Sequence, residues 1–191
     1  MQTPHLYYYH KKGLDPFRTV MDFPEAELVA FMETHLPEET IFHNDPTGYI
    51  RRRRETEAWL FTSFREIGGK PACPNPIYMT LGKSPYIERL GLYSECLEVP
   101  LSLFAPESLS FTYTDSYVSR WLAEAAHQCF NPLLHGRVFS LAEMLALLSD
   151  TPHVDARNSG NRRYNLFIEA QVWDHQPLRQ FCAAAAKKPS P

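Results

Sequence analysis

The chain has 191 residues, of which 44% are hydrophobic and 21% are charged, and its formal net charge is −3. This length favours one domain whose core is large enough to fold without a disulfide or a metal. The slightly acidic balance excludes a general nucleic-acid coat protein, because such proteins carry a basic excess over the whole domain.

The four cysteines, Cys73, Cys96, Cys129 and Cys182, are scattered along the chain without a CxxC pair. This spacing favours a reducing compartment over a disulfide framework. The first residues show no basic-then-apolar leader, and no apolar run approaches the ~20 residues that cross a bilayer. We therefore expect a cytoplasmic protein with no membrane partner.

The first half of the chain predicts a strand followed by two helices. "HLYYYH" at 5–10 is aromatic-rich and predicts the strand. Asp22, with Glu25 three residues later, predicts a capped helix over 22–36. Asp45 as a cap, with Pro46 at the first helical position, predicts a second helix over 46–67.

That second helix combines an apolar face with a run of four arginines. The apolar face passes through Leu60, Phe64 and Ile67. "RRRR" at 51–54 points in four directions around a helix, and Arg53 with Glu57 has the spacing of an i,i+4 ion pair. We expect this run to be a solvated helix surface rather than a nucleic-acid contact.

The second half alternates short strands and helices, separated by proline and glycine. Strands are expected at 76–82, 96–104, 108–113 and 165–173, and short helices at 84–91, after Asp115, and after the capping pair Ser140 and Glu143. In the last of these helices the expected buried stripe is Leu141, Met144, Leu145 and Leu148. The pattern predicts an α+β fold over a single domain at 1–181, with helices packed on a mixed, largely antiparallel or split sheet, and a flexible tail at 182–191.

The common catalytic motifs are missing from the sequence. It contains no GxGxxG, GxxxxGK[ST], GxSxG or HExxH. The closest cluster of zinc-type ligands, His127, Cys129 and His135, lacks a fourth ligand, so no metal is expected.

One charge in the last strand stands out. Along 165–173, alternation puts Ile168, Ala170 and Val172 on one face, and Glu169 on the other face beside aromatic residues. A buried unpaired carboxylate would cost several kcal/mol, so Glu169 is expected to be paired or to face water. Two interpretations remain open: a cleft, or an exposed outer strand face with Trp173 partly covered.

Five segments, laid end to end, resemble the strand succession of ADP-ribosyltransferase folds: "LYYYH", "NPIYMTLGKSPYI", "LEVPLSLF", "SFTYTDSYVS" and "FIEAQVWDHQPL". The nearest likeness is to the DNA-modifying ADP-ribosyltransferase toxins of bacterial toxin and antitoxin pairs. The resemblance implies that His10 holds the NAD ribose and that Glu169 is catalytic. It also implies a tyrosine stacked on nicotinamide, for which Tyr78 is the candidate.

The chain departs from that family at two places. Lys11 and Lys12 follow His10 where the family has a threonine-bearing segment. The arginine that grips the NAD phosphates has no motif here, and Arg18, Arg51 and Arg163 are the options, of which Arg163 is taken as the cofactor-binding candidate. The chain also resembles conserved bacterial proteins of about this length to which no activity can be assigned.

The resemblance therefore implies a protein that binds NAD, a nucleotide small molecule, and cleaves its nicotinamide–ribose bond. A fixed carboxylate suits that reaction, because the ribose passes through an oxocarbenium-like state. A degenerate, non-catalytic member and a binding or interaction protein without catalysis remain alternatives. The sequence does not choose between a nucleic-acid, protein or small-molecule acceptor.

Overall fold

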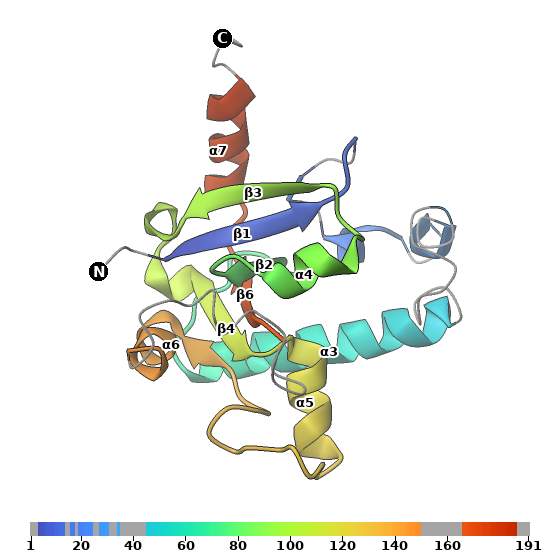
Figure 1. The fold of residues 1–191 in the computed structure, drawn as a ribbon, viewed down its shortest axis with the longest axis vertical. Helices are drawn as coiled ribbons and strands as arrows, with labels where there is room; N and C mark the ends of the chain where they lie inside the picture. The colour runs from blue at the N-terminus through green and yellow to red at the C-terminus, as the bar shows by residue number, and fades with distance from the viewer. Residues whose placement is uncertain are drawn as a thin grey trace.

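The computed structural model describes residues 4–13, 16, 17, 19–24, 27–30, 34, 45–149 and 166–186. Within them the chain forms an α+β fold around one six-stranded sheet, which confirms the expected class (Figure 1). The strands are β1 (His5–His10), β2 (Ile77–Leu81), β3 (Glu95–Pro100), β4 (Leu109–Tyr113), β5 (Phe139–Ser140) and β6 (Ile168–Val172). The helices are α3 (Pro46–Glu66), α4 (Pro85–Leu90), α5 (Ser116–Glu124), α6 (Leu141–Leu147) and α7 (Gln176–Ala186), with 3-10 turns at Val20–Asp22, Leu101–Leu103 and Pro106–Ser108.

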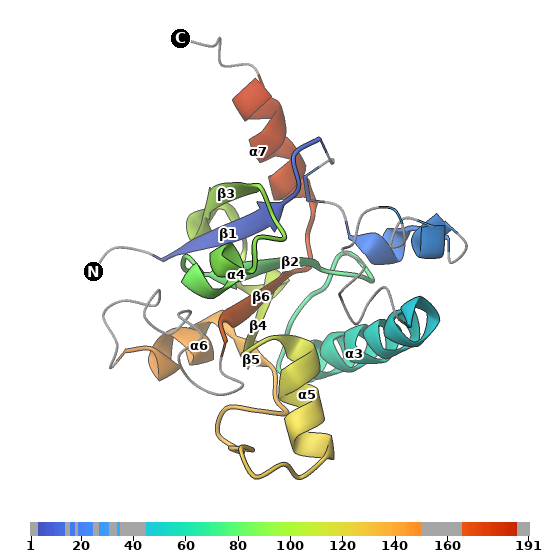
Figure 2. The same cartoon turned by 45° about the vertical axis from the view of Figure 1, so that its right-hand side comes forward.

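The strand order is β3-β1-β2-β6-β4-β5, and every neighbouring pair in it is antiparallel. Figure 2 shows the strands in this sequence from top to bottom. The last strand in the chain, β6, therefore lies in the middle of the sheet between β2 and β4. Its register places Glu169 opposite Thr80 on one side and opposite Thr112 on the other.

The central strands of the sheet are covered on both faces. On one face, the main apolar core gathers side chains from all the strands, and α6 and α7 close it with Met144, Leu148 and Leu178. On the other face, α3 packs Leu60 and Phe64 against Trp173, and α5 lies beside α3 in both views. A central strand in such a sheet has no solvent-exposed side.

The signals at the start of α3 act as the sequence predicts. The Asp45 carboxylate accepts a hydrogen bond from the backbone N of Gly48, and Pro46 occupies the first helical position. At the other end Gly68 has φ of +90°, which allows the Gly69 N–H to reach the carbonyl of Phe64. Ile67 is 40% exposed, because this turn carries it out of the apolar face to which the sequence assigned it.

Three further expectations differ from the structure or lie partly outside it. Leu145 is exposed rather than buried, because α6 has only seven residues and packs through Met144 and its C-cap residue, Leu148. α7 includes residues 182–186, which the sequence assigned to the tail, and the alanines there have the highest helix propensity. Of the helix expected over 22–36, residues 27–30 and 34 are described and helical. Among the described helices, none has the length and apolar character needed to cross a membrane.

Candidate functional site

The second face of the sheet, which we call the polar face, carries polar side chains although it is covered by helices. Alternation along β6 brings Glu169, Gln171 and Trp173 to this face, while Ile168 and Val172 enter the apolar core. Glu169 is 6% exposed and Trp173 is fully buried. The interpretation of an exposed outer strand face is therefore wrong, because α3 and α5 cover it.

A chain of hydrogen bonds runs along the polar face and ends at Glu169. The indole N–H of Trp173 donates to Ser110 Oγ at 2.8 Å, and that hydroxyl donates to Gln171 Oε1 at 2.8 Å. The amide Nε2 of Gln171 then donates to Glu169 Oε1 at 3.0 Å and to Thr112 Oγ1 at 3.2 Å. Because each partner is buried and hydrogen-bonded, the chain fixes the carboxylate of Glu169 in one orientation.

The N-terminus of α5 supplies the other donor to Glu169. The backbone N–H of Ser116 donates to Glu169 Oε1 at 3.1 Å, and Asp115 caps the helix by accepting from Val118 N at 2.9 Å. The bonds from Ser116 and Gln171 therefore both fall on Oε1 of Glu169. The turn from β4 into α5 is strained, since Thr114 has φ of +69°, a region that a β-branched residue rarely adopts.

This turn brings a second carboxylate close to the first. Burial raises the pKa of Asp115 to about 7, and repulsion from the Glu169 carboxylate adds to the rise. The positive end of the α5 dipole favours both anions. The hydroxyl of Ser116 is also buried, and it has no hydrogen-bond partner within the described part of the chain.

On the opposite wall, α3 contributes a buried ion pair. Arg53 Nε lies 3.2 Å from Glu57 Oε1, and the two side chains are 16% and 5% exposed. The Tyr78 hydroxyl donates to the same Glu57 oxygen at 3.1 Å, and the Arg53 guanidinium lies 3.6 Å from the centre of the Tyr78 ring. Burial raises the pKa of Glu57 and the pKa of Tyr78 above their usual values.

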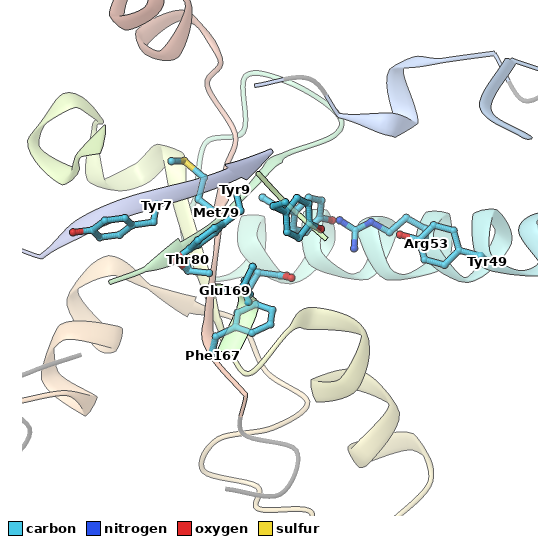
Figure 3. A pocket seen from close by; sticks show the side chains of 11 residues that line it. Tyr7, Tyr9, Tyr49, Arg53, Met79, Thr80, Phe167 and Glu169 are labelled. Carbon is cyan, nitrogen blue, oxygen red and sulfur yellow. The ribbon is translucent and has the colours of Figure 1, made fainter. Parts of the chain in front are cut away.

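A cavity of about 210 Å³ lies between these two walls and opens to the surface. Figure 3 shows Arg53 reaching from α3 towards the sheet and Glu169 projecting from β6 into the same space. Tyrosines form most of the aromatic lining, and the full set of lining residues is Tyr7, Tyr9, Tyr49, Arg53, Tyr78, Met79, Thr80, Ile87, Tyr93, Phe167 and Glu169. The cavity therefore combines π surfaces, one guanidinium and one carboxylate.

The cavity brings together two of the four residues that the sequence singled out. Tyr78 and Glu169 both line it. His10 does not: it lies on the apolar face with Tyr8, whose ring it stacks on at 5.6 Å, and its Nε2 lies 3.6 Å from Glu95. Arg163 falls outside the residues that the structure describes.

Of the arginine run on α3, the structure brings one member into the cavity. Arg51 and Arg54 are exposed, as expected of a solvated surface, but Arg53 and its partner Glu57 face inward, which corrects that expectation. The spacing of positions 53, 57, 60 and 64 carries the missed signal, since it places the ion pair on the same helical stripe as Leu60 and Phe64. Asp115 was expected only as a helix cap.

The two histidines considered as metal ligands accept hydrogen bonds from the backbone. His127 Nδ1 accepts from the backbone N of Cys129 at 3.1 Å, and His135 Nδ1 accepts from the backbone N of Asn131 at 3.1 Å. Both bonds stabilise tight turns after α5. Within the described ranges, no group of three His, Cys, Asp or Glu side chains is placed to hold a metal ion.

Comparison with known proteins adds no family to this description. No protein-family model, curated protein or solved structure matches the chain. Function therefore has to be inferred from the cavity and the residues around it.

Proposed function

We propose that the cavity binds the nicotinamide–ribose part of NAD and that Glu169 promotes cleavage of the bond between them. The observation that carries the proposal is the convergence of Tyr78 and Glu169 on one tyrosine-lined cavity. Tyrosine rings offer stacking surfaces for a planar heterocycle. The buried carboxylate supplies the charge that an oxocarbenium-like ribose requires.

The charge of the cavity supports a cationic ligand. Arg53 is neutralised by Glu57, with which it forms an ion pair at 3.2 Å. Glu169 forms no ion pair with any described residue, so its negative charge is left for the ligand. The nicotinamide ring of oxidised NAD is a cation with a planar π system, and tyrosine faces attract such cations.

The volume of the cavity suits the nicotinamide–ribose half of NAD rather than the whole cofactor. At about 210 Å³ it is smaller than the roughly 300–1,000 Å³ sites that hold whole drug-sized ligands. A ring and its sugar fit this space, and the adenosine half would lie outside it. The proposal therefore assigns the described cavity to the reactive end of NAD.

The proposed reaction breaks the bond between ribose C1′ and the pyridinium nitrogen. The bonding electron pair goes to that nitrogen and gives neutral nicotinamide, while C1′ becomes electron-poor. Glu169 stabilises the developing charge until an acceptor oxygen or nitrogen bonds to C1′ and loses its proton. Water serves as the acceptor in hydrolysis, and a DNA, protein or small-molecule group would serve in transfer.

Nicotinamide release from NAD tests this proposal directly. Glu169→Gln keeps the shape of the side chain and removes its charge, so release should fall by a factor of ~10²–10³. Glu107→Gln is the matched control, because Glu107 is exposed and forms only a surface ion pair with Lys70 at 3.7 Å. Equal release by wild type and Glu169→Gln, or no release by either, would reject the catalytic role.

A non-catalytic nucleotide-binding protein is the second candidate. It is favoured by the bonding of Glu169 Oε1, which already accepts from Ser116 N and Gln171 Nε2. A carboxylate held so firmly also suits a purely structural or binding role. NAD that raises the melting temperature without being cleaved would select this candidate, since ~100 times the dissociation constant adds about 2.7 kcal/mol.

A further inference from the structure

Two carboxylates meet at the first turn of α5. Glu169 Oε1 accepts from Ser116 N at 3.1 Å, and Asp115 Oδ1 accepts from Val118 N at 2.9 Å. These two amides are two residues apart, which is about 3 Å along a helix axis. The left-handed backbone of Thr114 turns the chain sharply between β4 and α5 and brings Asp115 to this position.

The positive charge that faces Asp115 and Glu169 already forms an ion pair with another carboxylate. Arg53 is the cation whose field reaches both Asp115 and Glu169, but its Nε lies against Glu57 at 3.2 Å. Neither Asp115 nor Glu169 forms an ion pair with a residue that the structure describes. Two adjacent carboxylates without their own counterion favour retention of a proton between them.

The remaining titratable groups around the cavity are tyrosines and Glu57. Burial raises the pKa of Tyr9, of Tyr78 and of Tyr93, so these phenols stay neutral at and below pH 8. Burial also raises the pKa of Glu57, whose carboxylate faces Arg53 and Tyr78. Tyr7 and Tyr49 complete the ring of phenols that line the cavity.

We propose that Asp115 is a specificity-determining residue: with Glu169 it holds one proton in the empty cavity, and an aromatic cation binds by replacing that proton. The inference rests on the proposed function for the choice of nicotinamidium as the cation. Asp115 acts through Glu169 rather than by lining the cavity. A neutral ring of the same shape has no charge with which to replace the proton, so the cavity discriminates by charge.

The raised pKa of Asp115, about 7, agrees with this arrangement. Below that pH the proton stays on the pair and the cation competes with it. Above that pH Asp115 has lost its proton, and the tyrosine-lined cavity holds an aromatic cation more tightly. Affinity for the cation should therefore rise with pH, while affinity for the neutral analogue should not.

Titration calorimetry at about pH 5 and about pH 8 tests the proposal with two probes. The first is 1-methylnicotinamide, which is a cation at every pH, and the second is nicotinamide, which is neutral over this range. Wild-type protein should bind the cation about a hundredfold more tightly at the higher pH, because at about pH 5 it must replace a proton held with a pKa of about 7. Nicotinamide should bind equally at both.

Asp115→Asn and Asp174→Asn separate the role of Asp115 from a general effect of charge. Asparagine caps helices as well as aspartate does, so Asp115→Asn should fold, and the affinity of its cavity for the cation should no longer change with pH. Asp174 accepts from Gln176 N at 3.0 Å beyond the other end of β6, and its variant should keep the full rise in affinity with pH. The persistence of the rise in Asp115→Asn would overturn the inference and point to Glu57.

The NAD-cleavage assay keeps this inference distinct from the proposed function. A pH-dependent affinity for the cation without nicotinamide release from NAD would support the role of Asp115 and reject catalysis. Release of nicotinamide from NAD, together with an affinity for the cation that is the same at both pH values, would support catalysis and reject the role of Asp115. A wild-type protein that binds neither probe at either pH would overturn the inference whether or not NAD is cleaved.

Discussion

The two faces of the sheet are both buried along β6 but are chemically different. The apolar face is lined by side chains such as Leu6, Met79 and Phe111, all at most 3% exposed. The polar face carries Glu169 and Gln171 at comparable depth, under α3 and α5. Apolar burial stabilises the first face directly, whereas the second gains stability only while each polar group keeps its partner.

The polar face also changes character along β6. At the Trp173 end it becomes an apolar cluster with Leu60 and Phe64, whose ring stacks on the indole at 5.7 Å. At the Glu169 end it opens into the cavity. The buried polar groups at the Glu169 end cost stability, whereas the apolar cluster at the Trp173 end packs well. The well-packed end can therefore serve as a rigid support for a binding site at the other end.

The largest expected effect comes from emptying the apolar face. Phe111 of β4 is fully buried in the main core. Phe111→Ala should lower the free energy of unfolding by about 3–5 kcal/mol, because it removes a buried ring and leaves a cavity. Urea denaturation measures the loss, and a value below about 1 kcal/mol, the size of a surface effect, would show that this face is not the stabilising one.

A smaller loss is expected from breaking the hydrogen-bond chain on the polar face. Gln171→Leu keeps the volume but removes the acceptor of Ser110 Oγ and one donor to Glu169, which should cost about 1–3 kcal/mol. Ile168→Val is the control on the same strand, and its cost on the apolar face should be about 0.5–1.5 kcal/mol. Both are measured by denaturant melts. A neutral or stabilising Gln171→Leu would mean that this chain of hydrogen bonds contributes nothing to the stability of the fold.

The sequence predicted the apolar face better than the polar one, because the features it predicted correctly depend only on residues that are neighbours in the chain. Strand positions 5–10 and the cap at Asp45 depend on neighbouring residues, so pattern alone was enough to find them. The alternation along 165–173 also assigned Ile168 and Glu169 to opposite faces correctly. Each of these predictions needs only the period of the element concerned.

The contents of the cavity depend on how distant segments meet, which pattern does not encode. Arg53 and Glu57 reach the polar face because α3 packs across β6, about a hundred positions later in the chain. His10 faces the apolar side because β1 pairs between β2 and β3 in one register, and a shift of one residue would reverse it. The resemblance to ADP-ribosyltransferases supplied roles for residues but no register.

The buried carboxyl of Asp115 should make stability depend on pH. The folded pKa of Asp115, about 7, exceeds its usual value of 3.8, so the folded state keeps a proton that the unfolded chain has lost. Stability should therefore be greatest below about pH 4 for this group and fall by about 1–2 kcal/mol as pH rises to about 7, a figure reduced for its partial exposure.

Asp115→Asn should remove this share of the pH dependence. The free energy of unfolding, measured by denaturant melts across that range, should then fall less steeply with pH. Some slope should remain, because the pKa of Glu57 is also raised by burial. An identical slope in wild type and Asp115→Asn would show that Asp115 is ionised in the folded protein throughout.

The smallest effect on activity is expected at His10. The resemblance to ADP-ribosyltransferases implies that His10 holds the NAD ribose, whereas the structure places it on the apolar face, away from the cavity. His10 contacts Tyr8 and lies 3.6 Å from Glu95, on the face opposite Glu169. His10→Gln should therefore leave nicotinamide release from NAD within about twofold of wild type, a change of under ~0.5 kcal/mol in the barrier. Tyr78→Leu, on the cavity wall, is the comparison that should weaken NAD binding. A loss at His10 as large as that at Tyr78 would mean that NAD contacts the edge of β1, and the site would then extend beyond the polar face.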